Sequence, residues 1–158
     1  MDSAAIMLLP DKTYIDARPE VVDHHLTVAF FGRASEISPE GYKRLRSVVN
    51  TIADRFEPIS AKANGVGVLD AGGDGFALVD LIDGIGPLYV RSLVQGFDDG
   101  IIPKINTRHG FTPHMTRAYF PRSADELTVA PMGMIDNLEF TFTAVGLWFG
   151  DLRYEISL

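Results

Sequence analysis

Two histidine–threonine pairs are the residues of this chain best suited to acid–base chemistry. His25-Leu26-Thr27 and His114-Met115-Thr116 each place a histidine two positions before a threonine, within an apolar stretch. In a β-strand the two polar side chains of a pair share one face, because residues i and i+2 do. Imidazole changes charge near neutral pH, so one histidine can accept a proton while the other donates one. Hydroxyls and an imidazolium can hold phosphate oxygens, so the doubled pattern predicts phosphodiester cleavage.

The composition limits the classes of cofactor and substrate that this chemistry could involve. The chain has no cysteine, which excludes disulfides, thiolate metal sites and cysteine nucleophiles. Its four histidines lack the close spacing of a zinc site, so neither a metal nor another cofactor is expected. The net charge is −7, whereas proteins that bind long nucleic acids usually present an excess of Lys and Arg. We therefore expect a small anionic substrate rather than long nucleic acid.

The elements that must position the motifs follow from hydrophobic periodicity. Helices are predicted at 38–56, with Ser38 as N-cap and Pro39 in the first position, and at 86–97, while 11–23 is a loop or short helix. Strands are predicted at 4–10, 25–32, 59–70, 75–83, the second motif up to residue 120, and three short pieces within 138–158. Along the first motif strand, alternation directs Leu26, Val28 and Phe30 into the core.

This order of elements predicts an α+β fold. Antiparallel sheets with helices on the outside would form one domain of residues 1–158, in which two pseudo-symmetric lobes flank a central cleft. The apolar run at 4–10 is too short to span a bilayer and is expected to be a core strand. We therefore predict a cytoplasmic protein without membrane association, and the residues favour no particular oligomer.

The motifs His25-Leu26-Thr27-Val28 and His114-Met115-Thr116-Arg117 resemble the two His-x-Thr/Ser-x motifs of the 2H phosphoesterase superfamily. That family includes 2′-5′ RNA ligase-like proteins, cyclic phosphodiesterases and bacteriophage anti-CBASS enzymes that degrade cyclic-nucleotide immune signals. The order of elements also resembles its two-lobed fold over essentially the whole chain. The resemblance implies that His25 and His114 are the catalytic pair and that Thr27 and Thr116 donate to phosphate oxygens. Arg117 departs from the family pattern, which is usually apolar at that position.

Five further residues are candidates for contact with the substrate. Alternation places Phe31 and Phe120 on the histidine face of their strands, where core or lobe-interface packing is favoured over the alternative of stacking on a base. Arg117 points away from the site by the same rule, unless a bulge turns it toward the substrate. Tyr119 has the parity of the core but could reach the end of the cleft. His109 could contact the substrate from the loop before the second motif.

We therefore predict a metal-independent phosphodiesterase that acts on small nucleotides, above all cyclic nucleotides or cyclic oligonucleotides, including immune signals of the kind that phage relatives degrade. One alternative is an enzyme that acts on RNA ends or on 2′,3′-cyclic phosphates, as the ligase-like relatives suggest. It would need a basic groove, for which the chain offers Lys43, Arg44, Lys104 and Arg108. The other alternative is a module that binds a nucleotide without turning it over.

Overall fold

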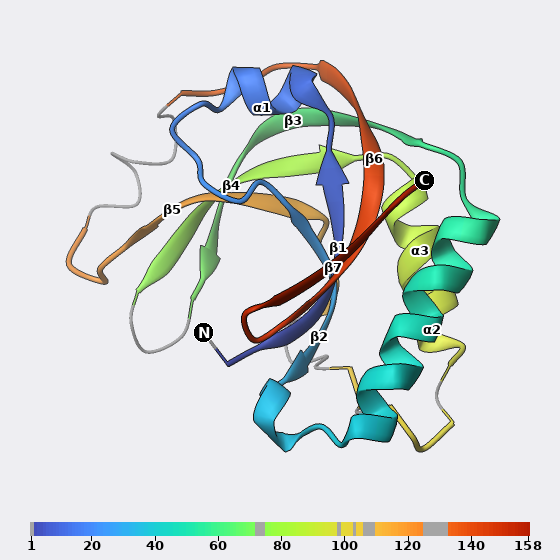
Figure 1. Ribbon diagram of the computed structural model, residues 1–158. Helices are drawn as coiled ribbons and strands as arrows, with labels where there is room; N and C mark the ends of the chain where they lie inside the picture. Colours follow the sequence, from blue (N-terminus) through green and yellow to red (C-terminus); the bar gives the residue numbers. More distant parts are fainter. Residues whose placement is uncertain (1, 72–74, 98, 103, 106–109, 125–132) are drawn as a thin grey trace.

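The strands of the computed structural model form one antiparallel sheet whose first and last strands meet. The structure describes residues 2–71, 75–97, 99–102, 104–105, 110–124 and 133–158. The sheet order is β2 (Leu26–Gly32), β1 (Ala4–Pro10), β6 (Leu138–Phe149), β3 (Ile59–Asp70), β4 (Phe76–Asp83) and β5 (His114–Phe120), with β7 (Leu152–Ser157) paired to β6 (Figure 1). Although β2 and β5 stand at opposite ends of this order, they contact each other. The sheet is therefore curled, and the two motif strands face one another.

Strand β6 joins the two halves of the sheet. Its first part, Leu138–Phe142, pairs with β3, and its later part, up to Phe149, pairs with β1. The predicted α+β fold is confirmed, with the strands of both halves in one continuous sheet. The prediction of three short strands in 138–158 is wrong, because the tail holds only the long β6 and β7. The chain turns at Gly150, which has φ of 59°, a conformation that glycine adopts readily.

Three α-helices of the described chain pack against the sheet. Helix α1 (Lys12–Ala17) begins after Asp11, and α2 (Pro39–Arg55) begins after Ser38, whose side chain accepts a hydrogen bond from the Gly41 amide, as predicted. Helix α3 (Gly86–Gln95) contacts α2, β2 and β3, and a short 3₁₀ turn η1 (Ala34–Glu36) follows β2. Helices α2 and α3 lie side by side at the right of Figure 1. Among the described residues no helix is long and apolar enough to cross a membrane.

Both motif strands carry a register shift at the same motif position. In the pairing with β1, Ile6 faces Ala29 and Met7 faces Thr27, so Val28 is an extra residue. In the pairing with β4, Leu78 faces Ala118 and Val79 faces Thr116, so Arg117 is an extra residue. The fourth residue of each His-x-Thr-x motif is thus a β-bulge. One extra residue exchanges the two faces of the strand beyond it.

The bulges overturn the alternation expected beyond each threonine. Phe30 is 38% exposed, whereas Phe31 is buried in the core, the reverse of the prediction. A further register shift falls at Phe31 itself. In β5 the side chain of Tyr119 is 72% exposed, while Phe120 stacks on Phe76 with ring centroids 5.7 Å apart. The residues up to and including each bulge still follow the sequence rule, since Leu26 and Val28 are both buried in the core as predicted.

Candidate active site

The two motif histidines are oriented in the same way by backbone carbonyls just before their strands. His25 Nδ1 lies 2.6 Å from the carbonyl oxygen of Asp23, and His114 Nδ1 lies 2.7 Å from that of Thr112. A carbonyl oxygen only accepts, so Nδ1 carries the proton in both rings and donates it. In each ring Nε2 is left to exchange a proton with a substrate. Asp23 has φ of 59°, a turn conformation that aspartate tolerates and that turns its carbonyl toward the ring.

Two neighbouring cavities meet at His114. The smaller cavity has a volume of about 220 Å³, and its lining residues are Thr27, Phe30, Arg91, Gly110, Phe111, Thr112 and His114. The larger, about 310 Å³, is lined by His114, Thr116, Tyr119 and residues of the β3–β4 end, and it shares Gly110 and Thr112 with the first. Thr27 of one motif and His114 of the other therefore line the same cavity, with Thr116 in the next. His25 itself lines neither cavity.

The ring of His25 packs against Trp148, which in turn packs against the guanidinium of Arg153. The His25 ring centroid lies 4.6 Å from that of Trp148, and the Arg153 guanidinium lies 3.6 Å from the Trp148 centroid. Arg153 also pairs with Asp23 at 3.2 Å, which fixes the residue whose carbonyl orients His25. Burial lowers the pKa of His25, and the positive charges of Arg153 and His114 lower it further, against the opposing effect of Asp23. The ring is therefore neutral at neutral pH, the form that accepts a proton.

Arg91 is a component of this site that is absent from the candidates predicted from the sequence. It is 6% exposed, lines the smaller cavity and donates from Nη1 to the carbonyl of Val28, the bulged residue of β2, at 2.6 Å. Its guanidinium lies 5.0 Å from the Phe111 ring centroid, and its Nε has no hydrogen-bond partner in the described part of the chain. A buried cation without a carboxylate partner is costly unless an anion neutralises it. This arrangement can hold a phosphate oxygen beside Thr27 and His114.

A sequence signal for Arg91 exists in its helical position. Helix α3 buries Pro87, Val90, Arg91 and Val94, which is the i, i+3, i+4, i+7 spacing of a core-facing stripe. A charged residue in that stripe needs a partner in the interior. An arginine within this otherwise apolar stripe is therefore the signal that could have identified Arg91 from the sequence.

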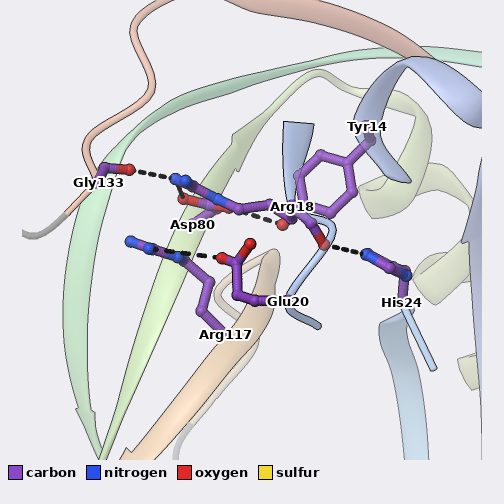
Figure 2. A network of polar contacts seen from close by, with 7 residues as sticks. All are labelled: Tyr14, Arg18, Glu20, His24, Asp80, Arg117 and Gly133. Carbon is purple, nitrogen blue, oxygen red and sulfur yellow. Dashed lines mark hydrogen bonds and ion pairs between the residues drawn. The ribbon is translucent and has the colours of Figure 1, made fainter. Parts of the chain in front are cut away.

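Arg117 faces away from the cavities and joins a buried charge cluster behind β5 (Figure 2). Its side chain is 10% exposed and pairs with Glu20 at 3.8 Å. Next to it, the fully buried Asp80 of β4 accepts hydrogen bonds from the Tyr14 hydroxyl at 2.7 Å and from two nitrogens of Arg18 at 2.8 Å each. Arg18 also donates to the Gly133 carbonyl, as Figure 2 shows. The bulge at Arg117 therefore does not turn this side chain toward the cavities.

The same cluster reaches both motifs. Asp80 pairs in register with Met115, the residue between His114 and Thr116. On the other side, the imidazole Nε2 of His24 lies 2.7 Å from the carbonyl oxygen of Arg18, so His24 is turned away from its neighbour His25 toward this network (Figure 2).

The remaining sequence candidates divide between the cavities and the core. Tyr119 lines the larger cavity, while Phe31 belongs to the core and Phe120 lines neither cavity. His109 lies outside the described residues. Within the described ranges no group of three or more His, Cys, Asp or Glu side chains is placed to hold a metal ion.

The described basic residues that an RNA-end enzyme would use do not gather at the cavities. Lys43, Arg44 and Lys104 line neither of them, and Arg44 is paired with Asp99 at 2.6 Å. Arg108 lies outside the described residues. The cation that does line the site, Arg91, suits a single phosphate better than an extended backbone.

Comparison with solved structures finds the same fold in proteins of low sequence identity. The chain superposes on TT0787 of Thermus thermophilus with TM-score 0.70 and 16% identity over 99% of this chain and 94% of that one. E. coli LigT complexed with 3′-AMP gives 0.63 and 16% over 99% and 95%, and Kluyveromyces marxianus Usb1 gives 0.62 and 13% over 99% and 98%. No curated protein matches by sequence.

Family assignment rests on the sequence itself. The model of the 2′-5′ RNA ligase superfamily matches residues 11–151, a span that includes both histidine motifs and both bulges. This family match supports phosphodiester-cleaving activity. With its two similarly oriented histidines and matching fold, the chain belongs to the 2′-5′ RNA ligase superfamily of 2H phosphoesterases, as its motifs predicted.

Proposed function

We propose that this protein is a metal-independent phosphodiesterase of small nucleotides, with cyclic nucleotides and cyclic oligonucleotides as its substrate class. The observation that carries the proposal is the matched orientation of His25 and His114: in each ring Nδ1 is bonded to a carbonyl, and Nε2 has no hydrogen-bond partner among the described residues. Paired acid and base groups of this kind activate a hydroxyl nucleophile on one side of a phosphate and protonate the leaving oxygen on the other. The mechanism uses only side chains of this chain.

His25 acts as the general base, because burial keeps its pKa low and its ring neutral. At a 3′-5′ linkage its Nε2 removes the proton of the adjacent 2′-hydroxyl, whose oxygen attacks phosphorus. His114 donates a proton to the departing 5′-oxygen, which leaves a 2′,3′-cyclic phosphate. With a 2′,3′-cyclic phosphate as substrate, water replaces the internal hydroxyl as nucleophile.

Thr27, Thr116 and Arg91 stabilise the phosphate during this exchange. The threonine hydroxyls donate to the non-bridging oxygens from the two cavities that meet at His114. Arg91 adds a positive charge from a site with little water, where electrostatic stabilisation of a developing charge is strongest. Thr27 now contacts the Met7 sulfur at 3.3 Å, a weak acceptor that a phosphate oxygen readily replaces.

Small substrates are favoured by the size and charge of the site. The cavities measure about 220 and 310 Å³, and Arg91 is the cation among their described lining residues. The net charge of −7 disfavours long nucleic acids. Among the structural neighbours, LigT was solved with 3′-AMP and with ATP, and Usb1 with uridine monophosphate. Action on RNA ends remains the second candidate, since the matching family is named for RNA ligation.

A substrate panel in the presence of a chelator tests the proposal. Cyclic mono-, di- and trinucleotides, 2′,3′-cyclic nucleotides and short RNAs are incubated with the wild type and with His25→Ala, His114→Ala and the double variant. Each single change should lower kcat/KM by about 10²–10⁴-fold. The double variant should be little worse, because the pair acts as a unit.

His24→Gln is the matched control, since His24 is also a partly buried histidine but faces Arg18 rather than the cavities. It should keep the activity of the wild type, and thermal melting should show all variants folded. A folded His25 or His114 variant with wild-type turnover would rule out the two-histidine mechanism.

A further inference from the structure

The two bulges place an aromatic ring at an equivalent position in each half of the site. Phe30 follows Thr27 by three residues, and Tyr119 follows Thr116 by three residues. In each strand the bulge between them, at Val28 or Arg117, exchanges the faces. The ring that would otherwise point to the core is therefore turned toward the side that carries the motif histidine and threonine.

Both rings are open to the cavities while their sequence neighbours are not. Phe30 is 38% exposed and lines the smaller cavity, and Tyr119 is 72% exposed and lines the larger. The next residue in each strand is packed away, because Phe31 is in the core and Phe120 stacks on Phe76. Neither Phe30 nor Tyr119 stacks on another aromatic ring of the described chain. Each ring thus offers a free face beside a motif threonine.

His114 stands between these two faces. It lines both cavities, together with Gly110 and Thr112, so the cavities adjoin at the histidine. A phosphodiester whose phosphorus lies at His114 directs one nucleoside toward Phe30 and the other toward Tyr119. Every nucleobase has a π-face, so base–aromatic stacking holds a nucleotide without selecting one base.

We infer that the substrate carries a nucleobase on each side of the scissile phosphate, one stacked on Phe30 and the other on Tyr119. The inference rests on the proposed function and narrows it: dinucleoside phosphodiesters, linear or within a cyclic oligonucleotide, are the substrates, in preference to nucleoside 2′,3′-cyclic phosphates. A mononucleoside cyclic phosphate fills only one of the two cavities.

The kinetic test compares Phe30→Leu and Tyr119→Leu on two substrates. These are the best dinucleoside phosphodiester from the panel and adenosine 2′,3′-cyclic phosphate. On the dinucleoside substrate each variant should lose about 5- to 150-fold in kcat/KM, the range expected for one lost base stack. On the mononucleoside substrate only one of them should lose activity. Tyr89→Leu is the matched control, because Tyr89 is a 55% exposed ring on α3 that lines neither cavity.

A binding test separates this inference from the proposed catalysis. The 2′-deoxy dinucleotide dApdA lacks the internal nucleophile, so its affinity for the wild type and the same variants is measured by calorimetry. Weaker binding by both variants supports the two stacking positions even if the wild type cleaves nothing, in which case only the proposed function fails. Wild-type affinity in either variant, or no binding of dApdA to the wild type, overturns the inference. Wild-type kcat/KM on the dinucleoside substrate in either variant overturns it as well.

Discussion

Asp80→Asn should destabilise the protein strongly, because it breaks a buried ion pair from one side. Asp80 is fully buried and accepts two hydrogen bonds from Arg18, at 2.8 Å each, and one from Tyr14 at 2.7 Å. The substitution leaves the Arg18 guanidinium charged and buried with no carboxylate in this contact. Loss of one partner of a buried pair costs about 3–5 kcal/mol. Since a domain of this size loses about 2–4 °C per kcal/mol, Tm should fall by roughly 6–20 °C.

Thermal and urea unfolding of four proteins measure this effect. The wild type, Asp80→Asn, Arg18→Met and the double variant Asp80→Leu with Arg18→Met are compared at neutral pH. Replacement of both charges by apolar groups of similar size is often neutral or stabilising, so the double variant should recover much of the lost stability. Tyr14→Phe is the milder control, since it removes one hydrogen bond, worth about 1 kcal/mol.

An Asp80→Asn protein as stable as the wild type would refute this reasoning. It would mean that the cluster of Figure 2 contributes no net free energy of unfolding. A double variant as unstable as Asp80→Asn would instead show that packing, rather than an unpaired charge, dominates the loss.

Three further predictions concern the site itself. Because the pKa of His25 is lowered from its ordinary value of 6.5 and its neutral form is the base, the acid limb of kcat/KM against pH should lie below 6.5. Trp148→Leu should move that limb upward by exposing the ring, and an unmoved limb would contradict the role of burial. Arg91→Met should lower kcat/KM by about 10- to 150-fold, as expected for one lost charge-assisted hydrogen bond of about 1.5–3 kcal/mol. Added guanidinium should partly restore the activity of this variant. Wild-type activity of Arg91→Met in the absence of guanidinium would exclude a contact between Arg91 and the phosphate. EDTA should leave turnover unchanged, and a loss reversed by a divalent metal would contradict the mechanism.

Local patterns in the sequence were sufficient for the family, most elements and the orientation of the motifs up to each threonine. The Ser38 cap, the helical stripe of α2 and the paired His-x-Thr motifs depend on neighbours a few residues away. Such features are specified by short-range hydrogen bonding and by the periods of helix and strand, which can be read along one chain. The α+β class follows from the order of those elements.

The tertiary structure decided what lines the site beyond the threonines. The bulges at Val28 and Arg117 exist only in the registers of β2 against β1 and of β5 against β4, so no periodicity within one strand predicts them. Because of these bulges, Phe30 rather than Phe31 lines the smaller cavity, and Tyr119 lines the larger one. Arg91 likewise reaches the site because α3 packs on β2, and its cation meets the Val28 carbonyl from 63 residues away in sequence. Pairing between distant strands and helices fixes these positions, because each depends on a partner that local sequence does not name.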